Sequence, residues 1–293
     1  MVKLYRRLLR IEVADEFGAL SSLEYHLCAG CDVRYFGPPV SGSERFYQSL
    51  QAFAWYYMDD KNEYGFAAPL VKACDDVLEI GCGKGAFARL ISCRSYLGLE
   101  YSNEARLMAE KAGVTVVNQS IQEHSVDNAG SYDVVCSFQV LEHVSEARSF
   151  IESAVACLKA GGLLIVSTPS ADSFAALVPN FILDMPPHHV TRWTDLSFER
   201  VARLFDLELV QLWHEPLQPV HRQFYLQTVL VSMSMRLFGR QNGVWDDSFL
   251  YRMVYLACRL PSRLLSLLCP GALVRKRGVS VTAVYRKPAR GMM

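Results

Sequence analysis

The stretch from Asp75 to Pro169 alternates short apolar runs with helical spans, and this alternation constrains the fold more than any other feature. The runs DDVLEI, YLGLE, VTVVN, YDVVCSF and LLIVSTP have the length and composition of strands. The spans AFARLISC, SNEARLMAEKAG and EARSFIESAVACLKA, the last ending at Gly161-Gly162, have helical spacing. Such alternation is typical of parallel strands joined by right-handed crossovers. We therefore predict an α/β protein built on a doubly wound, mostly parallel sheet.

A glycine-rich turn, EIGCGKG, follows the first of these strands and occupies residues 79–85. Sheets of this kind bind ligands at the carboxyl ends of their strands, and alternating glycines leave bare main chain for a ligand to lie against. The G-x-G-x-G spacing and the acidic Glu79 differ from the G-x-G-x-x-G of dinucleotide sites. Glu100 ends the next strand, where a carboxylate can accept both ribose hydroxyls. The alternative interpretation is a plain glycine turn beside two solvated acids.

Five motifs, taken with their order and spacing, resemble the class I S-adenosylmethionine-dependent methyltransferases, and more narrowly a bacterial branch of them. They are VLEIGCGKGAF, YLGLEYS, YDVVCSFQVLEHV, LKAGGLLIVSTPS and MPPHHVTRW, and the resemblance covers Phe46 to Pro216. It implies a Rossmann-like sheet of seven strands, with LELVQLWHEPL as the sixth and GVSVTAVYRK as the returning seventh. It also implies S-adenosylmethionine as the cofactor.

The resemblance further implies a cofactor site assembled from the ends of four strands. The glycine turn would line the methionine and ribose, with Glu100 on the ribose and Tyr101 near the adenine. Residues after the third strand would flank the adenine, where relatives often carry an acid and this chain offers only Glu123. Residues after the fourth strand would close over the sulfonium. The expected cofactor-binding residues are Glu79, Gly81, Cys82, Gly83, Gly85, Glu100, Tyr101, Ser120, Ile121, Phe138 and Gln139.

Three histidines are candidates for a catalytic base: His143 after the fourth strand, and His188 and His189 in the segment LDMPPHHVTRW. Methyl transfer is an in-line displacement in which alignment and exclusion of water do much of the work. A hydroxyl acceptor must also lose a proton, which a histidine can accept near neutral pH. We expect one of the tandem histidines to face the cleft and the other to hydrogen-bond the loop, with a slight preference for His189 as the base. The alternatives are helix-end packing for His143 and plain loop architecture for the pair.

Residues 1–45 are predicted to form an N-terminal extension ahead of a cofactor-binding domain at residues 46–220. Cys28 and Cys31, in HLCAGCDVRYFGPP, resemble half of a zinc ribbon, and His26 could add a third ligand. A closed structural zinc site needs four ligands, and the fourth is not apparent. We therefore expect a degenerate ribbon and no bound metal.

The aromatic segment RFYQSLQAFAWYYMDDKNEYGFAAPLVKAC follows the extension and is predicted to be helical. In the resembling family such a segment commonly covers the cofactor as a lid and shapes the acceptor pocket. Core packing is the alternative role for each of its tyrosines. The tyrosines that could touch a ligand are Tyr47, Tyr56, Tyr57 and Tyr64.

Residues 221–277 form a predicted helical insertion, and residues 278–293 the final strand and tail. Residues 1–221 hold 18 basic and 28 acidic side chains, a balance of −10, whereas residues 222–293 hold 12 and 2, a balance of +10. Two apolar helical stretches fill the insertion, FYLQTVLVSMSMRLFG and SFLYRMVYLACRLPSRLLSLLC. The second carries Arg252, Arg259 and Arg263 on one face, and Arg275-Lys276-Arg277 follow it.

This basic and apolar pattern resembles an amphipathic element that lies on an anionic membrane. The alternative is a helical subdomain or a dimer contact with solvated arginines. No nucleic-acid partner is expected, because the basic residues alternate with aliphatic side chains and not with exposed stacking aromatics. The oligomeric state is left open.

The nine cysteines are odd in number and scattered, which is typical of buried free thiols in a reducing cytoplasm. The start of the chain lacks the features of a signal peptide, and no run has the roughly 18–20 apolar residues that a membrane-spanning helix needs. We expect a cytoplasmic protein at the inner face of the membrane, if the insertion binds lipid.

The sequence thus predicts an S-adenosylmethionine-dependent methyltransferase that acts on a small molecule or a sugar, most simply at oxygen. The resembling branch is frequent in surface-polysaccharide and secondary-metabolite pathways. Two other classes stay open: a non-catalytic partner protein that binds the cofactor, and a nicotinamide-dependent oxidoreductase, which the glycine spacing and Glu79 disfavour.

Overall fold

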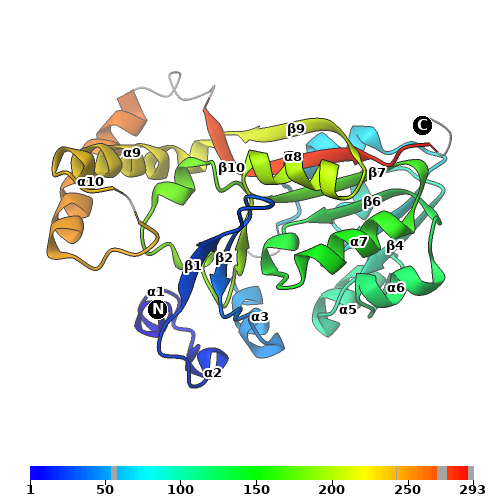
Figure 1. Cartoon of the computed structure of the whole chain (residues 1–293), viewed down its shortest axis with the longest axis horizontal. Coiled ribbons are helices and arrows are strands. Elements are labelled where there is room, and N and C mark those ends of the chain that lie inside the picture. Colours follow the sequence, from blue (N-terminus) through cyan, green and yellow to red (C-terminus); the bar gives the residue numbers. More distant parts are fainter. Residues whose placement is uncertain (54–57, 242, 269–275, 290–293) are drawn as a thin grey trace.

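The computed structural model describes residues 1–53, 58–241, 243–268 and 276–289. Its centre is a seven-stranded sheet in the order β5-β4-β3-β6-β7-β10-β9 (Figure 1). Neighbouring strands from β5 to β7 are parallel, whereas β10 is antiparallel to both β7 and β9. The predicted doubly wound, mostly parallel seven-stranded sheet is confirmed. The strands are β3 (Asp76–Ile80), β4 (Ser95–Leu99), β5 (Val116–Val117), β6 (Tyr132–Phe138), β7 (Leu158–Pro169), β9 (Glu208–Pro216) and β10 (Arg277–Arg286).

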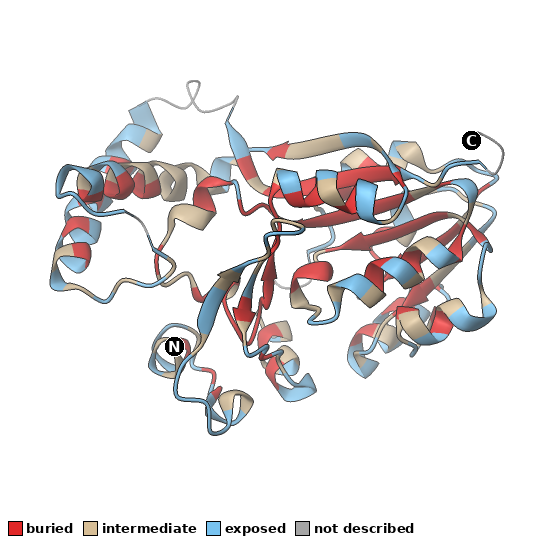
Figure 2. Ribbon diagram, in the orientation of Figure 1, coloured by how far each residue is buried: buried red, intermediate tan, exposed pale blue. Residues whose placement is uncertain are grey.

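Helices cover both faces of the sheet, so the strands are largely buried between two layers (Figure 2). Ile151 of α7 and Phe198 of α8 pack on one face, and Tyr64 of α4 packs on the other. Side chains alternate along β6, so Val135 belongs to the first layer and its neighbour Cys136 to the second. The covering helices are α4 (Asn62–Ala67), α5 (Asn103–Lys111), α6 (Ile121–Asp127), α7 (Ala147–Cys157) and α8 (Asp195–Leu204).

Hydroxyl side chains fix where three of these helices begin. Ser102 accepts a hydrogen bond from the Ala105 amide in the first turn of α5. Ser120 and Glu123 form a capping box on α6, and Thr194 forms one with Ser197 on α8. The caps set the direction in which the chain leaves each strand end, which is where the cavity described below lies.

Two helical predictions are wrong in extent. The span AFARLISC forms a single 3-10 turn at Ala88–Leu90, because only residues 81–94 separate β3 from β4 and the glycine turn uses the first of them. α7 ends at Cys157, ahead of the predicted stop at Gly161-Gly162. Leu158 is fully buried and already pairs with Tyr132 of β6, so the chain joins the sheet at once.

The N-terminal part of the chain packs behind the loop that carries His188 and His189. α1 (Val2–Leu9), α2 (Ala14–Phe17) and α3 (Glu44–Gln51) flank a three-stranded sheet of β1 (Glu24–Leu27), β2 (Arg34–Gly37) and β8 (Thr191–Arg192). The hydroxyl of Tyr5 donates to the main-chain oxygens of Ile182 and Met185 at 2.6 and 3.2 Å. This extension therefore supports one wall of the cavity from outside.

The predicted helical insertion is present as α9 (Arg222–Leu237) and α10 (Phe249–Leu268), which lie side by side and project from the sheet (Figure 1). Val231 and Met235 of α9 pack on Val254 and Cys258 of α10. None of the helices described is long and apolar enough to cross a membrane. Arg275 of the predicted basic run lies outside the described residues.

Candidate functional site

A cavity of about 1310 Å³ opens at the carboxyl ends of the central parallel strands, the place predicted for a ligand. Parts of α3, the glycine turn, the ends of β4 and β6, the loop with the tandem histidines and the start of α9 all contribute to its lining. Most of the predicted cofactor-binding residues line it. They are Gly81, Cys82, Gly83, Glu100, Tyr101, Ser120, Ile121, Phe138 and Gln139.

The glycine turn presents main chain to the cavity and is held by Glu100. One carboxylate oxygen of Glu100 accepts from the Gly83 amide at 2.9 Å, and the other accepts from the Ser102 amide at 2.8 Å. Burial raises the pKa of Glu100, while these amides act in the opposite direction. Gly81 has φ 71°, and a Cβ there would collide with Val140, so the turn requires glycine at this position.

Two predicted cofactor-binding residues, Glu79 and Gly85, do not line the cavity. Glu79 is 1% exposed and points to the opposite side of β3, where it accepts the hydroxyl hydrogen of Tyr96; burial raises its pKa to about 8. A Cβ on Gly85 would press on Val114, so this glycine serves the packing behind the turn. Side chains alternate along β3, so Ile80 faces the cavity and its neighbour Glu79 points away from it.

Gln139 ends β6 in a left-handed conformation, with φ 59°. Its side-chain amide donates to Glu63 at 3.2 Å and lies 3.4 Å from the hydroxyls of Ser167 and Ser280. Such backbone conformations persist only where the surroundings hold them, and they concentrate at functional sites. Glu63 is buried, its pKa is raised by burial, and it lines the cavity; the sequence interpretation did not single it out.

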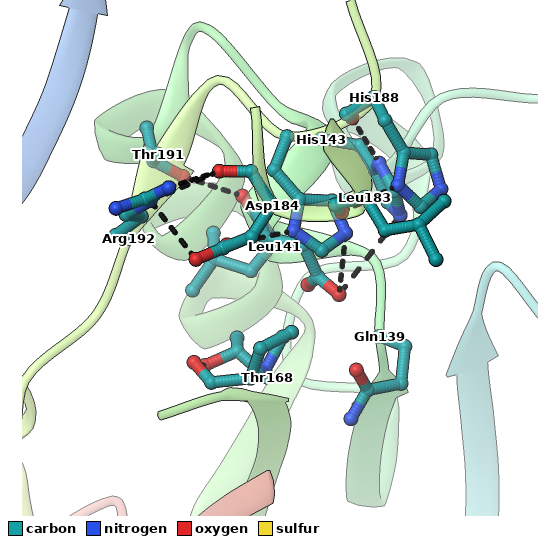
Figure 3. Close-up of polar contacts among 12 residues, drawn as sticks. Gln139, Leu141, His143, Thr168, Leu183, Asp184, His188, Thr191 and Arg192 are labelled. Carbon is teal, nitrogen blue, oxygen red and sulfur yellow. Dashed lines mark hydrogen bonds and ion pairs between the residues drawn. The ribbon is translucent and has the colours of Figure 1, made fainter. Parts of the chain in front are cut away.

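His143, His188 and His189 form a compact group in the cavity wall, called here the histidine cluster. Figure 3 labels two of the three rings, those of His143 and His188. The ring centroid of His143 lies 4.8 Å from those of both other rings, and the rings of His188 and His189 stack at 4.3 Å. His143 lies on the 3-10 turn Leu141–His143 after β6, and the pair follows the turn Ile182–Asp184. Segments far apart in the chain thus converge on one spot, since 45 residues separate His143 from His188.

Each ring of the histidine cluster has its Nδ1 next to an oxygen acceptor. The distances are 2.6 Å from His143 Nδ1 to the His188 carbonyl, 2.8 Å from His188 Nδ1 to the Leu183 carbonyl, and 3.0 Å from His189 Nδ1 to Asp184 Oδ1. A carbonyl or a carboxylate can only accept, so we assign the proton of each neutral ring to Nδ1. The Nε2 atoms then carry free lone pairs.

The expectation that one of the tandem histidines faces the cleft while the other hydrogen-bonds the loop is wrong. Both rings hydrogen-bond the loop, and both line the cavity. Burial lowers the pKa of His143 to about 4 and lowers the pKa of His188 and His189 well below the usual value. All three rings are therefore neutral in the protein at neutral pH. His189 differs from His188 in one respect: its partner is a carboxylate, which in turn lies 3.0 Å from Arg192 Nε.

Glu142 is the main residue of this wall that the sequence interpretation missed. It is 1% exposed and lines the cavity, and neither of its carboxylate oxygens has a hydrogen-bond partner. Its Oε1 lies 3.9 Å from His143 Nε2 and 4.0 Å from His189 Nε2. Burial raises its pKa to about 8. The one sequence signal for Glu142 is its position directly before a candidate base, His143.

The aromatic segment contributes two of its four candidate tyrosines to the described cavity wall. The Tyr47 hydroxyl lies 3.2 Å from His143 Nδ1, and its ring packs edge-on against that imidazole. Tyr64 is buried beside Phe138. Tyr56 and Tyr57 lie outside the described residues.

Cys28 and Cys31 lie at the turn between β1 and β2, and both are free thiols. His26, the third suggested ligand, stacks on Tyr35 instead, with ring centroids 5.1 Å apart. The histidine cluster is the group, among the described residues, in which three or more histidine, cysteine or acidic side chains lie close enough to hold a metal. The sequence pattern for a metal had indicated the cysteines instead.

The comparisons with known proteins agree with this fold and site. A family model described as a methyltransferase domain matches residues 47–212, more than half of the chain. The chain therefore belongs to this family, within the class I S-adenosylmethionine-dependent methyltransferases, and S-adenosylmethionine is the cofactor of that class. The predicted boundary of the cofactor-binding domain at residue 46 lies one residue from the start of the match.

Two curated relatives illustrate the match. A probable S-adenosylmethionine-dependent methyltransferase of Mycobacterium tuberculosis is 33% identical over 183 residues, covering 59% of this chain and 64% of that protein. A ubiquinone biosynthesis O-methyltransferase of Vibrio parahaemolyticus is 38% identical over 100 residues, covering 31% of this chain and 43% of that protein. The chain thus spans less than two thirds of the length of either relative.

Solved structures share the fold. A methyltransferase of Archaeoglobus fulgidus has a TM-score of 0.50 and 15% identity, over 84% of this chain and 95% of that one. A putative methyltransferase of Bacillus halodurans has a TM-score of 0.51 and 18% identity, over 79% of this chain and 100% of that one. At such identities the likeness shows the fold alone.

Proposed function

We propose that the protein transfers a methyl group from S-adenosylmethionine to a hydroxyl oxygen of a small-molecule or sugar acceptor. The observation that carries the proposal is the pairing of Asp184 and His189 in the wall of the cavity that also contains the glycine turn and Glu100. A carboxylate on Nδ1 orients the ring and leaves Nε2 to act as a base. The O-methyltransferase activity named for the Vibrio parahaemolyticus relative is in keeping with oxygen as the acceptor atom.

In the proposed reaction the acceptor hydroxyl gives its proton to Nε2 of His189. An oxygen lone pair forms the new bond to the methyl carbon, and the bond from that carbon to sulfur breaks with its electron pair remaining on sulfur. The products are the methyl ether and S-adenosylhomocysteine. Burial of the ring keeps it neutral before the reaction, and Asp184 stabilises the imidazolium that forms.

The size of the cavity supports a two-ligand site. Pockets for a single drug-sized molecule usually measure about 300–1,000 Å³, and this one measures about 1310 Å³. Glu100 and the glycine turn are proposed to hold the cofactor. The histidine cluster, Tyr47 and Phe224 of α9 are proposed to surround the acceptor.

A cofactor-binding assay followed by a transfer assay tests the proposal. Calorimetry is expected to show binding of S-adenosylmethionine and none of NADH. Methyl transfer from labelled cofactor to extracts of sugars, lipid-linked glycans and phenols is expected to yield a labelled ether. Binding of cofactor without labelling of any acceptor would favour a non-catalytic partner protein, and a label on nitrogen or carbon would refute oxygen as the acceptor atom.

We also propose that α10 lies on an anionic membrane surface. Phe249, Leu256, Leu260 and Leu267 are 78%, 59%, 65% and 71% exposed, and their spacing places them on the helix face away from Val254 and the other residues that pack on α9. Arg252, Arg259 and Arg263 are exposed and border this apolar face. A basic border on an apolar stripe fits a lipid surface better than a second copy of the same basic helix.

Sedimentation with vesicles tests this second proposal. Full-length protein is expected to sediment with vesicles containing phosphatidylglycerol and much less with neutral phosphatidylcholine vesicles. Leu260→Glu is expected to weaken sedimentation, whereas Leu204→Glu, an exposed leucine at the end of α8, serves as the matched control. Equal sedimentation of both variants, or a dimer in solution that Leu260→Glu dissociates, would overturn it.

A further inference from the structure

We propose that the histidine cluster binds one divalent transition-metal ion of the zinc type through the three Nε2 atoms, leaving the fourth position open to the acceptor oxygen. The juxtaposition that carries the proposal is three buried or half-buried imidazoles, one nitrogen from each lying within 4.8 Å of the others, beside the unpartnered carboxylate of Glu142. The inference rests on the proposed function only in taking the acceptor hydroxyl as the fourth ligand. Metal binding by the three histidines can be tested without that assumption.

The rings of the histidine cluster are oriented as those of metal-binding histidines are. Histidines that bind metals almost always donate the other ring N–H to a carboxylate or a main-chain carbonyl, which fixes the tautomer. Each ring of the cluster has such a partner for Nδ1: Asp184 for His189, and main-chain oxygens for the other two. The outer contacts that a three-histidine site requires are thus already in place.

The ring nitrogens lie nearly close enough together to share one ion. Tetrahedral bonds of about 2.0–2.1 Å place ligand nitrogens roughly 3.4 Å apart. One ring nitrogen from each histidine lies within 4.8 Å of the others, so a set of nitrogens at this spacing must approach by at most about 1.4 Å. The rings of His188 and His189 stack at an interplanar angle of 20°, so binding also turns one ring relative to the other. Both changes are side-chain rotations within a cavity of ample volume.

Glu142 is buried, has no hydrogen-bond partner and lines the same cavity. A buried carboxylate that lacks hydrogen bonds is unfavourable unless a cation, a proton or an ordered water compensates it. Its Oε1 lies about equally far from His143 Nε2 and His189 Nε2, at 3.9 and 4.0 Å. That separation leaves room for a metal-bound water or hydroxyl to lie between the ion and the carboxylate.

The ligand types indicate the ion. Imidazole nitrogens suit zinc, iron, nickel and copper, whereas magnesium and calcium require mainly oxygen ligands. Three histidines with one open position are the arrangement of catalytic zinc sites. The cysteine pair near the N-terminus, where the sequence suggested a degenerate ribbon, offers too few ligands for a comparable site in the part of the chain described.

An ion in this position changes how the acceptor loses its proton. A bound hydroxyl is more acidic because the cation stabilises the alkoxide. With its Nε2 on the ion, His189 no longer takes the proton. The cation favours the charged form of the neighbouring Glu142, and this carboxylate accepts the proton instead. The alkoxide oxygen forms the bond to the methyl carbon as the carbon–sulfur bond breaks, so the atoms and electrons balance as in the metal-free reaction.

Metal titration of the full-length protein tests the inference directly. After treatment with a chelator, calorimetry and metal analysis are expected to show about one Zn²⁺ per chain, with Mg²⁺ binding at least about 100-fold more weakly. Co²⁺ is expected to give the visible absorption of a nitrogen-rich four-coordinate site. Absence of Zn²⁺ binding would overturn the inference while leaving the proposed methyl transfer intact.

Variants separate the ligands from their surroundings. His188→Ala is expected to abolish Zn²⁺ binding, and His143→Gln repeats the test should the first variant not fold. Glu142→Gln is expected to keep Zn²⁺ affinity within a few fold, because this residue is not a ligand. A double variant, Cys28→Ser with Cys31→Ser, is the matched control and is expected to bind Zn²⁺ like the original chain.

Two outcomes would identify a different site. Zn²⁺ binding that survives His188→Ala, or that disappears in the cysteine double variant, contradicts the assignment to the histidine cluster. A protein that binds Zn²⁺ through the cluster but labels no hydroxyl acceptor would keep the metal site and overturn the proposed function. The metal site and the transfer to a hydroxyl oxygen therefore fail independently, whereas Zn²⁺ on His189 Nε2 would replace His189 by Glu142 as the base.

Discussion

The two walls of the cavity are constructed in different ways. The wall at the glycine turn is main chain, held by the carboxylate of Glu100 between the amides of Gly83 and Ser102. The wall at the histidine cluster is made of buried side chains, each oriented by a hydrogen bond to a neighbouring oxygen. The first wall depends on backbone space, and the second depends on the tautomers and orientation of side chains.

This difference shows which substitutions affect which step. A change at the glycine turn alters the shape of the backbone and should affect stability and cofactor affinity. A change in the histidine cluster removes a reacting group while leaving the backbone and the cofactor wall in place. Three predictions test the separation and a fourth concerns a cluster outside both walls, in order from the largest expected effect to the smallest.

His189→Ala is expected to lower the rate of methyl transfer by about 10²- to 10⁴-fold, the usual contribution of a positioned acid or base. The affinity for S-adenosylmethionine should stay unchanged, because His189 lies in the other wall. Single-turnover transfer and calorimetry measure the two quantities. Full activity in both His189→Ala and His188→Ala would show that the tandem histidines serve only the structure of the loop.

Gly81→Ala is expected to destabilise the protein by about 2–4 kcal/mol, because the new methyl group both forces a strained φ and collides with Val140. Gly113→Ala is the matched control: its φ is 79°, but no atom lies within 4 Å of the added Cβ. Denaturant unfolding should therefore show a smaller loss, about 1 kcal/mol, for the control. Equal losses would mean that Val140 moves aside.

Glu100→Gln is expected to weaken cofactor binding by about 10- to 100-fold, because the amide accepts less strongly and presents a donor to amides that require an acceptor. Transfer at saturating cofactor should change little. Glu123→Gln is the control, since Glu123 only caps α6 and does not line the cavity. Similar affinities for the two variants would remove Glu100 from the cofactor wall.

The smallest effect concerns pH and a cluster outside both walls. Hydrogen bonds from Arg94 and Lys159 hold the pKa of Asp76 below its usual value in the folded protein. A lowered folded pKa stabilises the fold above the unfolded pKa of about 4, and this contribution is lost as the pH falls further. Asp76→Asn should lower the unfolding midpoint at pH 7 and flatten its decline below pH 4. If the unfolding midpoints of Asp76→Asn and the original chain fall in parallel with pH, this ion-pair network contributes nothing measurable to stability.

The sheet and the main-chain wall could be predicted because their signals are local. Glycine spacing and strand ends follow each other along the chain, and the parallel topology brings Gly81, Gly83 and Glu100 to one edge. Glu79 and Gly85 belong to the same motif but lie outside the cavity lining, because side chains alternate across β3 and Gly85 packs against Val114. The local pattern gives the position of a turn more reliably than the direction of each side chain.

The histidine wall could be predicted only as a list of residues. His188, the nearer of the tandem histidines, follows His143 by 45 residues in the sequence. The contact between them depends on packing by the N-terminal extension, including Tyr5. The partners that fix the rings, Asp184 and the main-chain oxygens, have no distinct sequence signal. Glu142 was missed for the same reason, because its significance comes from the lack of partners in the folded protein.

The connection between β9 and β10 has a consequence for how acceptor choice can change. Pro216 and Arg277 pair across these strands, and the Leu217 amide donates to the Lys276 carbonyl at 2.7 Å. The insertion between β9 and β10 therefore leaves and re-enters the sheet at neighbouring points. Phe224, at the start of this insertion, also lines the cavity. Exchanging the whole insertion between relatives should therefore change acceptor preference and membrane binding together, while the glycine turn and Glu100 stay unchanged.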